Sequence, residues 1–128
     1  MAKISEIMTK EVFTTAPNAS VAEVAGEMVR GRIGSALVMD GGWLAGIFTD
    51  RDALRAAASG KDLRAATISE WMTAEPITTS PDADSDEAAE VMAAHGFRHL
   101  PVMNDNEVVG IVSLRDVMAT RISRPQPS

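Results

Sequence analysis

The chain has 128 residues, of which 45% are hydrophobic, so it is long enough for one ordinary domain or two small subdomains and too apolar for a disordered chain. Its formal net charge of −6 argues against broad binding to nucleic acid or to an anionic membrane surface. It has no cysteine, which excludes disulfides, cysteine-ligated zinc and thiol nucleophiles.

The first half of the chain carries the signals of a β-α-β-β-α unit. Ser20 stands three residues before Glu23, which is the spacing of a capping box, so we expect a helix to begin at Val21. The run 40–42 (Asp-Gly-Gly) separates two apolar segments and favours a hairpin turn, because Asp and Gly tolerate positive φ. In chain order we expect a capped turn at 4–9, a strand at 12–15, a helix at 21–30 with Gly31 as its C-cap, strands at 36–39 and 44–48, and a helix from Asp50.

The second half repeats these signals 64 residues later. Residues 4–54 align with residues 68–118 without a gap, and 19 of the 51 aligned positions are identical. This period exceeds that of the usual solenoid repeats, so two units most simply form one pair related by a pseudo-twofold axis, with two related clefts for ligands. The expected elements are a capped turn at 68–73, a strand at 77–79, a helix at 85–95 with Gly96 as its C-cap, strands at 100–103 and 108–112, and a helix from Leu114.

Both strand-to-helix junctions carry the pattern hydroxyl-x-Arg-Asp. A helix N-terminus offers unpaired N–H groups that suit phosphate, and a carboxylate can accept hydrogen bonds from the two vicinal hydroxyls of a ribose. The same spacing is close to that of a capping box, so a ligand site and a helix cap are both open interpretations. The junction residues are Thr49, Asp50, Arg51 and Asp52 in the first half and Ser113, Leu114, Arg115 and Asp116 in the second.

A second candidate site is the pair Arg98 and His99, directly before a predicted strand. Two adjacent cations there could bind a phosphate, although a surface arginine beside a structural histidine is an equal alternative. The first half has Gly34 and Ser35 at the matching positions, without a cation. The only histidines are His95 and His99, and no nucleophile or metal-ligand motif occurs, so we expect neither a metal site nor an enzyme.

Two β-α-β-β-α copies, each opening with Ile-Ser-Glu-x-Met-Thr and closing with Gly-Ile-x-(Ser/Thr)-x-Arg-Asp, resemble a tandem pair of CBS domains. The resemblance covers about residues 3–122. It implies an α+β fold of two tandem CBS repeats related by pseudo-twofold symmetry. The expected organisation is a first CBS domain at 3–58, a linker at 59–66, a second CBS domain at 67–122 and a flexible tail at 123–128.

The resemblance also implies a regulatory module that binds adenosine-containing ligands in clefts between the copies. Asp52 and Asp116 would hold the ribose, the first strand of each copy would lie against the base, and Arg98 with His99 would reach the phosphate at the opposite site, the one marked by Asp52. The implied ligand-binding residues are Val12, Thr14, Thr49, Asp50, Arg51, Asp52, Ile77, Thr78, Arg98, His99, Ser113, Arg115 and Asp116.

The expected ligands are AMP, ADP and ATP, ahead of NAD and S-adenosylmethionine, and no cofactor is required. The family resemblance further implies a homodimer formed through the helices at 50–58 and 114–121, and a regulated protein that the sequence does not name. The chain has no apolar run of 18 residues and no apolar secretion signal at its start, so we expect a soluble, cytoplasmic protein with no membrane or nucleic-acid partner. The alternative function is a ligand-free scaffold for dimerisation or for a protein partner.

Overall fold

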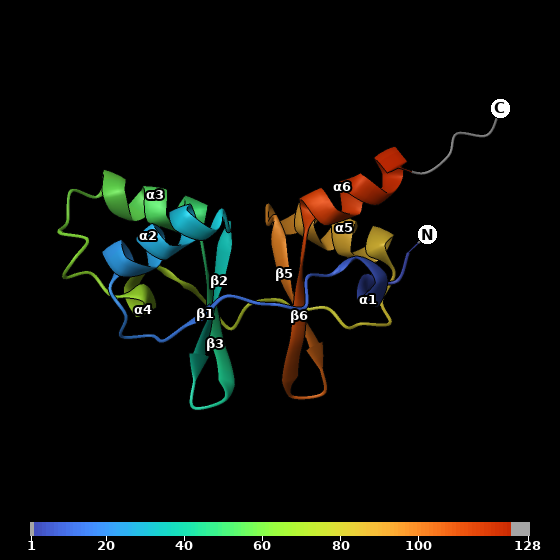
Figure 1. Ribbon diagram of the computed structural model, residues 1–128, viewed down its shortest axis with the longest axis horizontal. Helices are drawn as coiled ribbons and strands as arrows, with labels where there is room; N and C mark the ends of the chain where they lie inside the picture. The colour runs from blue at the N-terminus through green and yellow to red at the C-terminus, as the bar shows by residue number, and fades with distance from the viewer. Residues whose placement is uncertain (1, 124–128) are drawn as a thin grey trace. The chain divides into compact units, whose positions relative to one another are not determined.

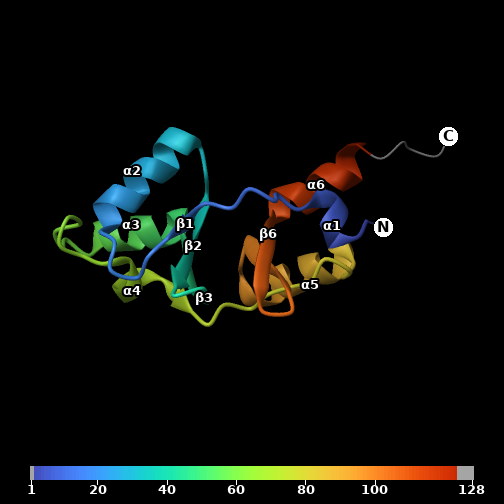
Figure 2. The ribbon, with the colours of Figure 1, turned by 60° about the horizontal axis from the view of Figure 1, so that its bottom comes forward.

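The computed structural model describes residues 2–123, and the chain divides into two compact units (Figures 1 and 2). We call residues 12–76 the central unit, and described residues 2–11 together with 77–123 the terminal unit. Both units combine helices with a small sheet, which confirms the predicted α+β class with two repeats. Residues 124–128, within the predicted tail, lie outside the described part of the chain.

The central unit contains a sheet with strand order β1-β2-β3-β4. Strand β1 runs parallel to β2, whereas β2 with β3 and β3 with β4 are antiparallel. Helix α2 contacts β2 and α3, and α3 and α4 both contact β3, so the helices pack against the sheet (Figure 1). The elements are β1 (Thr14–Thr15), α2 (Val21–Gly31), β2 (Ser35–Asp40), β3 (Trp43–Thr49), α3 (Asp50–Ala58), α4 (Ile68–Trp71) and β4 (Thr73–Ala74).

The terminal unit contains the matching hairpin and helices. Its elements are α1 (Ile4–Ile7), α5 (Ser85–His95), β5 (His99–Asn104), β6 (Glu107–Ser113) and α6 (Leu114–Ser123). Single bridges replace the two outer strands of the central unit: Thr79 pairs in parallel with Val102, and Thr9 pairs antiparallel with Ile111. The predicted hairpins and long helices are confirmed in both units. Each hairpin strand extends one residue beyond its predicted bounds at either end, whereas α5 has the predicted bounds.

Two local predictions were wrong, and one short strand was missed. The strand predicted at 77–79 is reduced to one bridge at Thr79, since Pro101, which stands where Leu37 donates its N–H to the Phe13 carbonyl in the first half, has no N–H to donate. The short strand β4 was not predicted. Helix α2 includes Gly31 and ends at Arg32, whose φ of 54° puts this arginine in the left-handed C-cap position, whereas Gly96 caps α5 with φ 73° as predicted.

The opening segment of each sequence repeat packs in the unit built by the other repeat. Ile4, at the start of the first repeat, is fully buried against Met92 and Leu100 of the second. Ile68, at the start of the second, is fully buried in the cluster around Val21 and Phe48 of the first. The compact units therefore do not coincide with the sequence repeats. The opening segment of each repeat contributes a buried isoleucine to the core formed by the other repeat.

Backbone hydrogen bonds fix these exchanged segments in matching ways. The Ile4 N–H donates to the Ala83 carbonyl at 2.9 Å, and the Ile68 N–H donates to the Ala19 carbonyl at 2.9 Å. Acidic caps begin both helices, since Glu6 accepts from the Lys3 N–H and Glu70 from the Thr67 N–H. The hydrogen bonds from Thr67 hold the pKa of Glu70 below its ordinary value of 4.5.

The segment predicted as a linker packs onto helix α2. The Val21 N–H donates to the Ala66 carbonyl at 2.9 Å, and the Ala22 N–H donates to the Leu63 carbonyl at 3.0 Å. Ala66 is buried in the core cluster of the central unit. These residues therefore satisfy two of the free N–H groups in the first turn of α2. Within residues 2–123, no helix has the length and apolarity that a membrane span needs.

A methionine packs on a glycine where each exchanged segment crosses the sheet. A Cβ added to Gly46 would lie 2.6 Å from the Met72 sulfur and 2.7 Å from the Thr73 carbonyl oxygen. A Cβ added to Gly110 would lie 2.8 Å from the Met8 sulfur and 2.8 Å from the Thr9 carbonyl oxygen. Backbone approaches backbone at both crossings, so only glycine fits there.

We expect Gly46→Ala to lower the free energy of unfolding by about 1–3 kcal/mol, because the added methyl group overpacks a site bounded by backbone. The matched control is Gly26→Ala in α2, where the atom nearest an added Cβ is the Arg30 guanidinium at 3.3 Å. That end of a flexible side chain can move, and alanine favours the helix by up to about 1 kcal/mol. Urea unfolding measures both variants, and equal stability of the two would contradict this account of the crossing.

Candidate functional site

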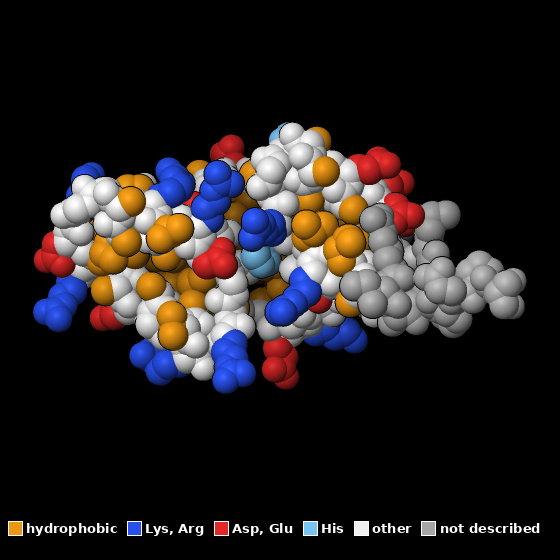
Figure 3. Space-filling view, turned by 90° about the horizontal axis from the view of Figure 1, so that it is seen from above, with side chains coloured by type: hydrophobic (Ala, Val, Ile, Leu, Met, Phe, Trp, Pro, Cys, Tyr) orange, Lys and Arg blue, Asp and Glu red, His pale blue; other side chains and the backbone are white. Residues whose placement is uncertain are grey.

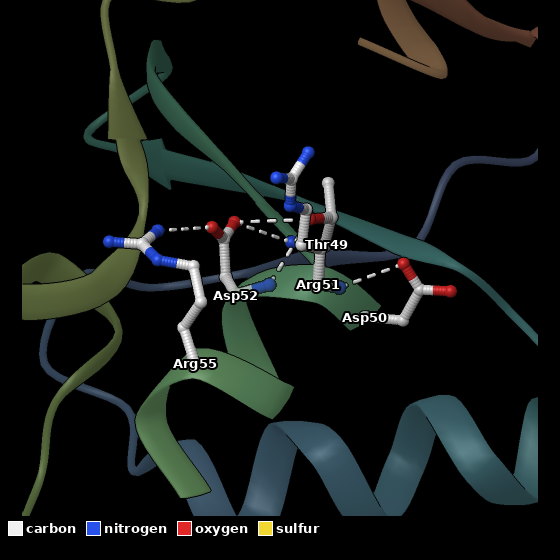
Figure 4. Close-up of polar contacts among 5 residues, drawn as sticks. All are labelled: Thr49, Asp50, Arg51, Asp52 and Arg55. Atoms are coloured by element: carbon white, nitrogen blue, oxygen red, sulfur yellow. Dashed lines mark hydrogen bonds and ion pairs between the residues drawn. The ribbon is translucent and has the colours of Figure 1, made fainter. Parts of the chain in front are cut away.

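Helix α3 begins with a reciprocal cap between Thr49 and Asp52. The Thr49 N–H donates to Asp52 Oδ2 at 2.9 Å, and the Asp52 N–H donates to Thr49 Oγ1 at 3.4 Å (Figure 4). The Thr49 hydroxyl also donates to Asp52 Oδ2, at 3.2 Å. The capping interpretation of this motif is therefore confirmed. The cap uses Oδ2 of Asp52 and leaves Oδ1 outside it.

Helix α6 begins in the same way. The Ser113 N–H donates to Asp116 Oδ2 at 2.8 Å, and the Asp116 N–H donates to Ser113 Oγ at 3.0 Å. Asp116 is half-buried, and its second oxygen, Oδ1, makes no hydrogen bond or ion pair with any side chain of residues 2–120. Each junction thus holds an aspartate whose position is fixed through Oδ2 at the N-terminus of a helix.

The two aspartates differ in what reaches Oδ1. Arg55, one turn along α3, places Nη1 3.0 Å from Asp52 Oδ1 (Figure 4). The Asp52 side chain is 8% exposed, whereas that of Arg55 is 59% exposed. The equivalent position in α6 is Ala119, which has no charge to offer.

The predicted cations lie beside the α6 junction within the terminal unit. His99 is the cross-strand partner of Ser113, and the Arg98 carbonyl accepts a hydrogen bond from the Leu114 N–H at 2.8 Å. Arg98 is exposed and His99 half-buried. In the central unit, Ser35 stands opposite Thr49, so no cation occupies the matching place there.

The remaining predicted residues divide between the units. Val12 and Thr14 belong to the central unit with Asp52, and Thr14 pairs with Leu37 of β2. Ile77 and Thr78 belong to the terminal unit with Asp116, and both are exposed. Asp50, Arg51 and Arg115 are exposed in the first turns of their helices, and Asp50 Oδ1 accepts the Arg51 N–H at 2.9 Å. The structure thus groups these side chains by unit, and their part in binding stays a prediction.

Sequence reasoning missed Arg55 and its second neighbour, Trp71. The Arg55 guanidinium carbon lies 5.7 Å from the Trp71 ring centroid, and Lys61 Nζ lies 5.9 Å from it. The indole Nε1 is buried without a hydrogen-bond partner among the side chains that the structure describes, and the ring packs against the core of the central unit. The spacing of three between Asp52 and Arg55 was a readable signal for the ion pair.

In the stretch from 2 to 123, no group of three or more His, Asp or Glu side chains is placed to hold a metal ion. His95, which the sequence places near His99, instead stacks on Phe97 with ring centroids 5.3 Å apart.

Loss of the cap should be measurable at α3. We expect Thr49→Ala to lower the free energy of unfolding by about 1 kcal/mol, because the Asp52 N–H loses its acceptor. Thr49→Ser keeps a hydroxyl at the same place and serves as the control. Chemical denaturation compares them, and an alanine variant as stable as the serine variant would show that the side-chain cap contributes nothing.

Comparison with known proteins extends over both repeats. The family model described as CBS domain matches residues 4–59 and 68–122. The CBS domain-containing protein YhcV of Bacillus subtilis is 36% identical over 124 residues, which cover 96% of this chain and 88% of that protein.

Two solved structures of similar fold contain adenosine compounds. The CBS domain pair of protein MJ0100, in complex with 5′-methylthioadenosine and S-adenosyl-L-methionine, has a TM-score of 0.89 and 30% identity, covering 98% of this chain and 99% of that one. A CBS domain protein from Pyrobaculum aerophilum, complexed with AMP, has a TM-score of 0.83 and 30% identity, covering 90% of this chain and 89% of that one.

Proposed function

Because this chain belongs to the CBS-domain family, we propose that it is a regulatory module that binds adenosine-containing ligands at Asp52 and Asp116. The observation that carries the proposal is the state of Asp116. Its Oδ2 is fixed by the α6 cap, and its Oδ1 has no partner in the described part of the chain. A carboxylate held in place with an open oxygen can accept the hydroxyls of a ribose.

The ligand class follows from this chemistry and from the relatives. AMP, S-adenosylmethionine and methylthioadenosine, which occupy the similar structures, all contain adenosine with a ribose diol. We propose AMP, ADP and ATP as ligands ahead of NAD and S-adenosylmethionine, with no cofactor required. The base would lie against the first strand segments, which contain Val12 and Thr14 in the central unit and Ile77 and Thr78 in the terminal unit.

The proposed activity is regulation rather than catalysis. A ligand can shift a protein between two states only if it binds one of them more tightly. The states would differ in a surface used by a second copy or by a regulated protein. Leu54 on α3 and Met118 on α6 are apolar and exposed, at 71% and 41%, and they support a dimer contact through these helices.

A second function, a scaffold without a ligand, is favoured by one observation. Both aspartates already cap helices, and Arg55 also holds Asp52. Selection for stability alone would keep the same residues. The two functions make opposite predictions in a ligand titration.

We expect at least one of AMP, ADP, ATP, NAD and S-adenosylmethionine, at millimolar concentration, to raise the melting temperature of the protein. A ligand at 100 times its Kd adds about 2.7 kcal/mol, which corresponds to several degrees for a domain of this size. Differential scanning fluorimetry on protein freed of nucleotide measures this shift. An unchanged melting temperature with all five compounds would reject the sensor and favour the scaffold.

The proposed phosphate contact can be tested separately. On the face drawn in Figure 3, acidic, basic and hydrophobic side chains are mixed, so an anion would depend on a few placed cations rather than on a broad basic surface. We expect Arg98→Ala to weaken AMP binding about tenfold and to leave adenosine binding unchanged, because a charge-assisted hydrogen bond contributes about 1.5–3 kcal/mol.

Calorimetric titration of both compounds measures this difference. Lys10→Ala, which removes an exposed cation from the same unit, is the matched control. Equal weakening of AMP and adenosine would place Arg98 outside phosphate recognition.

A further inference from the structure

The two aspartates have unequal capacity for a ribose. A carboxylate offers about four acceptor positions, two on each oxygen. Asp116 receives one hydrogen bond, from the Ser113 N–H, within the described residues. Asp52 receives three: two on Oδ2 from the Thr49 N–H and hydroxyl, and one on Oδ1 from Arg55. A ribose diol brings two donors, so Asp116 can accept both and Asp52 cannot while Arg55 stays bound.

Arg55 is able to leave. Its side chain is 59% exposed, and it is joined to Asp52 through a single Nη1 contact at 3.0 Å. Its guanidinium also lies over the Trp71 ring. The same arginine therefore contacts the candidate ribose acceptor and one face of a tryptophan that comes from the exchanged segment α4.

This arrangement exists in one unit only. The second repeat has Ala119 at the position of Arg55. The first repeat has Ile7 at the position of Trp71. Asp52 thus has an arginine on Oδ1, whereas Oδ1 of Asp116 has no partner among residues 2–120.

We propose that Arg55 is a latch that competes with the ribose for Asp52, so that adenosine, which has no phosphate, fills the Asp116 site first and the Asp52 site second. This inference rests on the proposed function and adds an order of binding to it. Occupation of the second site moves Arg55 off Asp52 and away from Trp71. The change at Trp71 then reports the second binding event.

The direct test is titration of adenosine, which has a ribose and no phosphate, into the Asp116→Asn protein, where only the Asp52 site remains. We expect Arg55→Ala, which copies the residue of the other repeat, to tighten binding at least fivefold in this background. Arg55→Gln, which keeps the length and removes the charge, should act in the same direction and guards against a folding defect in the alanine variant. Arg64→Ala, an exposed arginine of the same unit, should leave the affinity unchanged.

Fluorescence gives a second readout. Trp43 and Trp71 are the only tryptophans, so Trp43→Phe leaves Trp71 as the sole indole. Adenosine should change its emission when Arg55 is present and leave it unchanged in Arg55→Ala.

The outcomes distinguish failure of the Arg55 latch from failure of the proposed ligand binding. Weaker or equal adenosine binding in Arg55→Ala and Arg55→Gln overturns the latch while the proposed function stands. Absence of adenosine and AMP binding to the wild-type protein and to every variant overturns the proposed function and the latch together.

Discussion

The contact on which the rest of the structure depends is the crossing of an opening segment over a glycine of the other repeat. Met8 and Thr9 lie against Gly110, and Met72 and Thr73 lie against Gly46. Because each opening helix buries an isoleucine in the core of the other repeat, neither repeat completes its own core. A unit of some 50 residues gains too little from burial to be secure alone, and the exchange makes folding of the two repeats interdependent.

The same strand that accepts this crossing leads directly into the candidate site. Gly46 lies three residues before Thr49, and Gly110 three before Ser113, so packing of the exchanged segment fixes the strand whose end caps the helix. The cap then fixes Oδ2 of the aspartate, whereas the contacts of Oδ1 differ between the two units. The cap and the proposed ribose contact would thus use different oxygens of one side chain, except where Arg55 holds Asp52 Oδ1.

Local chemistry made much of the fold predictable from the sequence. Helix α2 follows from the Ser20 cap, and the hairpins follow from turn residues such as Asp40 and Gly41, because these signals act within a few residues. The CBS-domain assignment, which rested on repeated motifs, is confirmed.

The exchange of opening segments was not predictable, since Ile4 and Ile68 look identical in sequence and their partners are set by the tertiary fold. Arg55 was visible as a helical neighbour of Asp52, but its effect on the acceptor required the coordinates. The ligand-binding residues themselves stay predictions.

The most direct test of the central claim, that the two junction aspartates are the ligand sites, is calorimetric stoichiometry with AMP. The account predicts two molecules bound per wild-type chain at saturation, one in Asp52→Asn and in Asp116→Asn, and none in the double variant with the fold retained by circular dichroism. Undiminished AMP binding in the folded double variant would contradict it, because the ligand would then be held by residues other than these carboxylates.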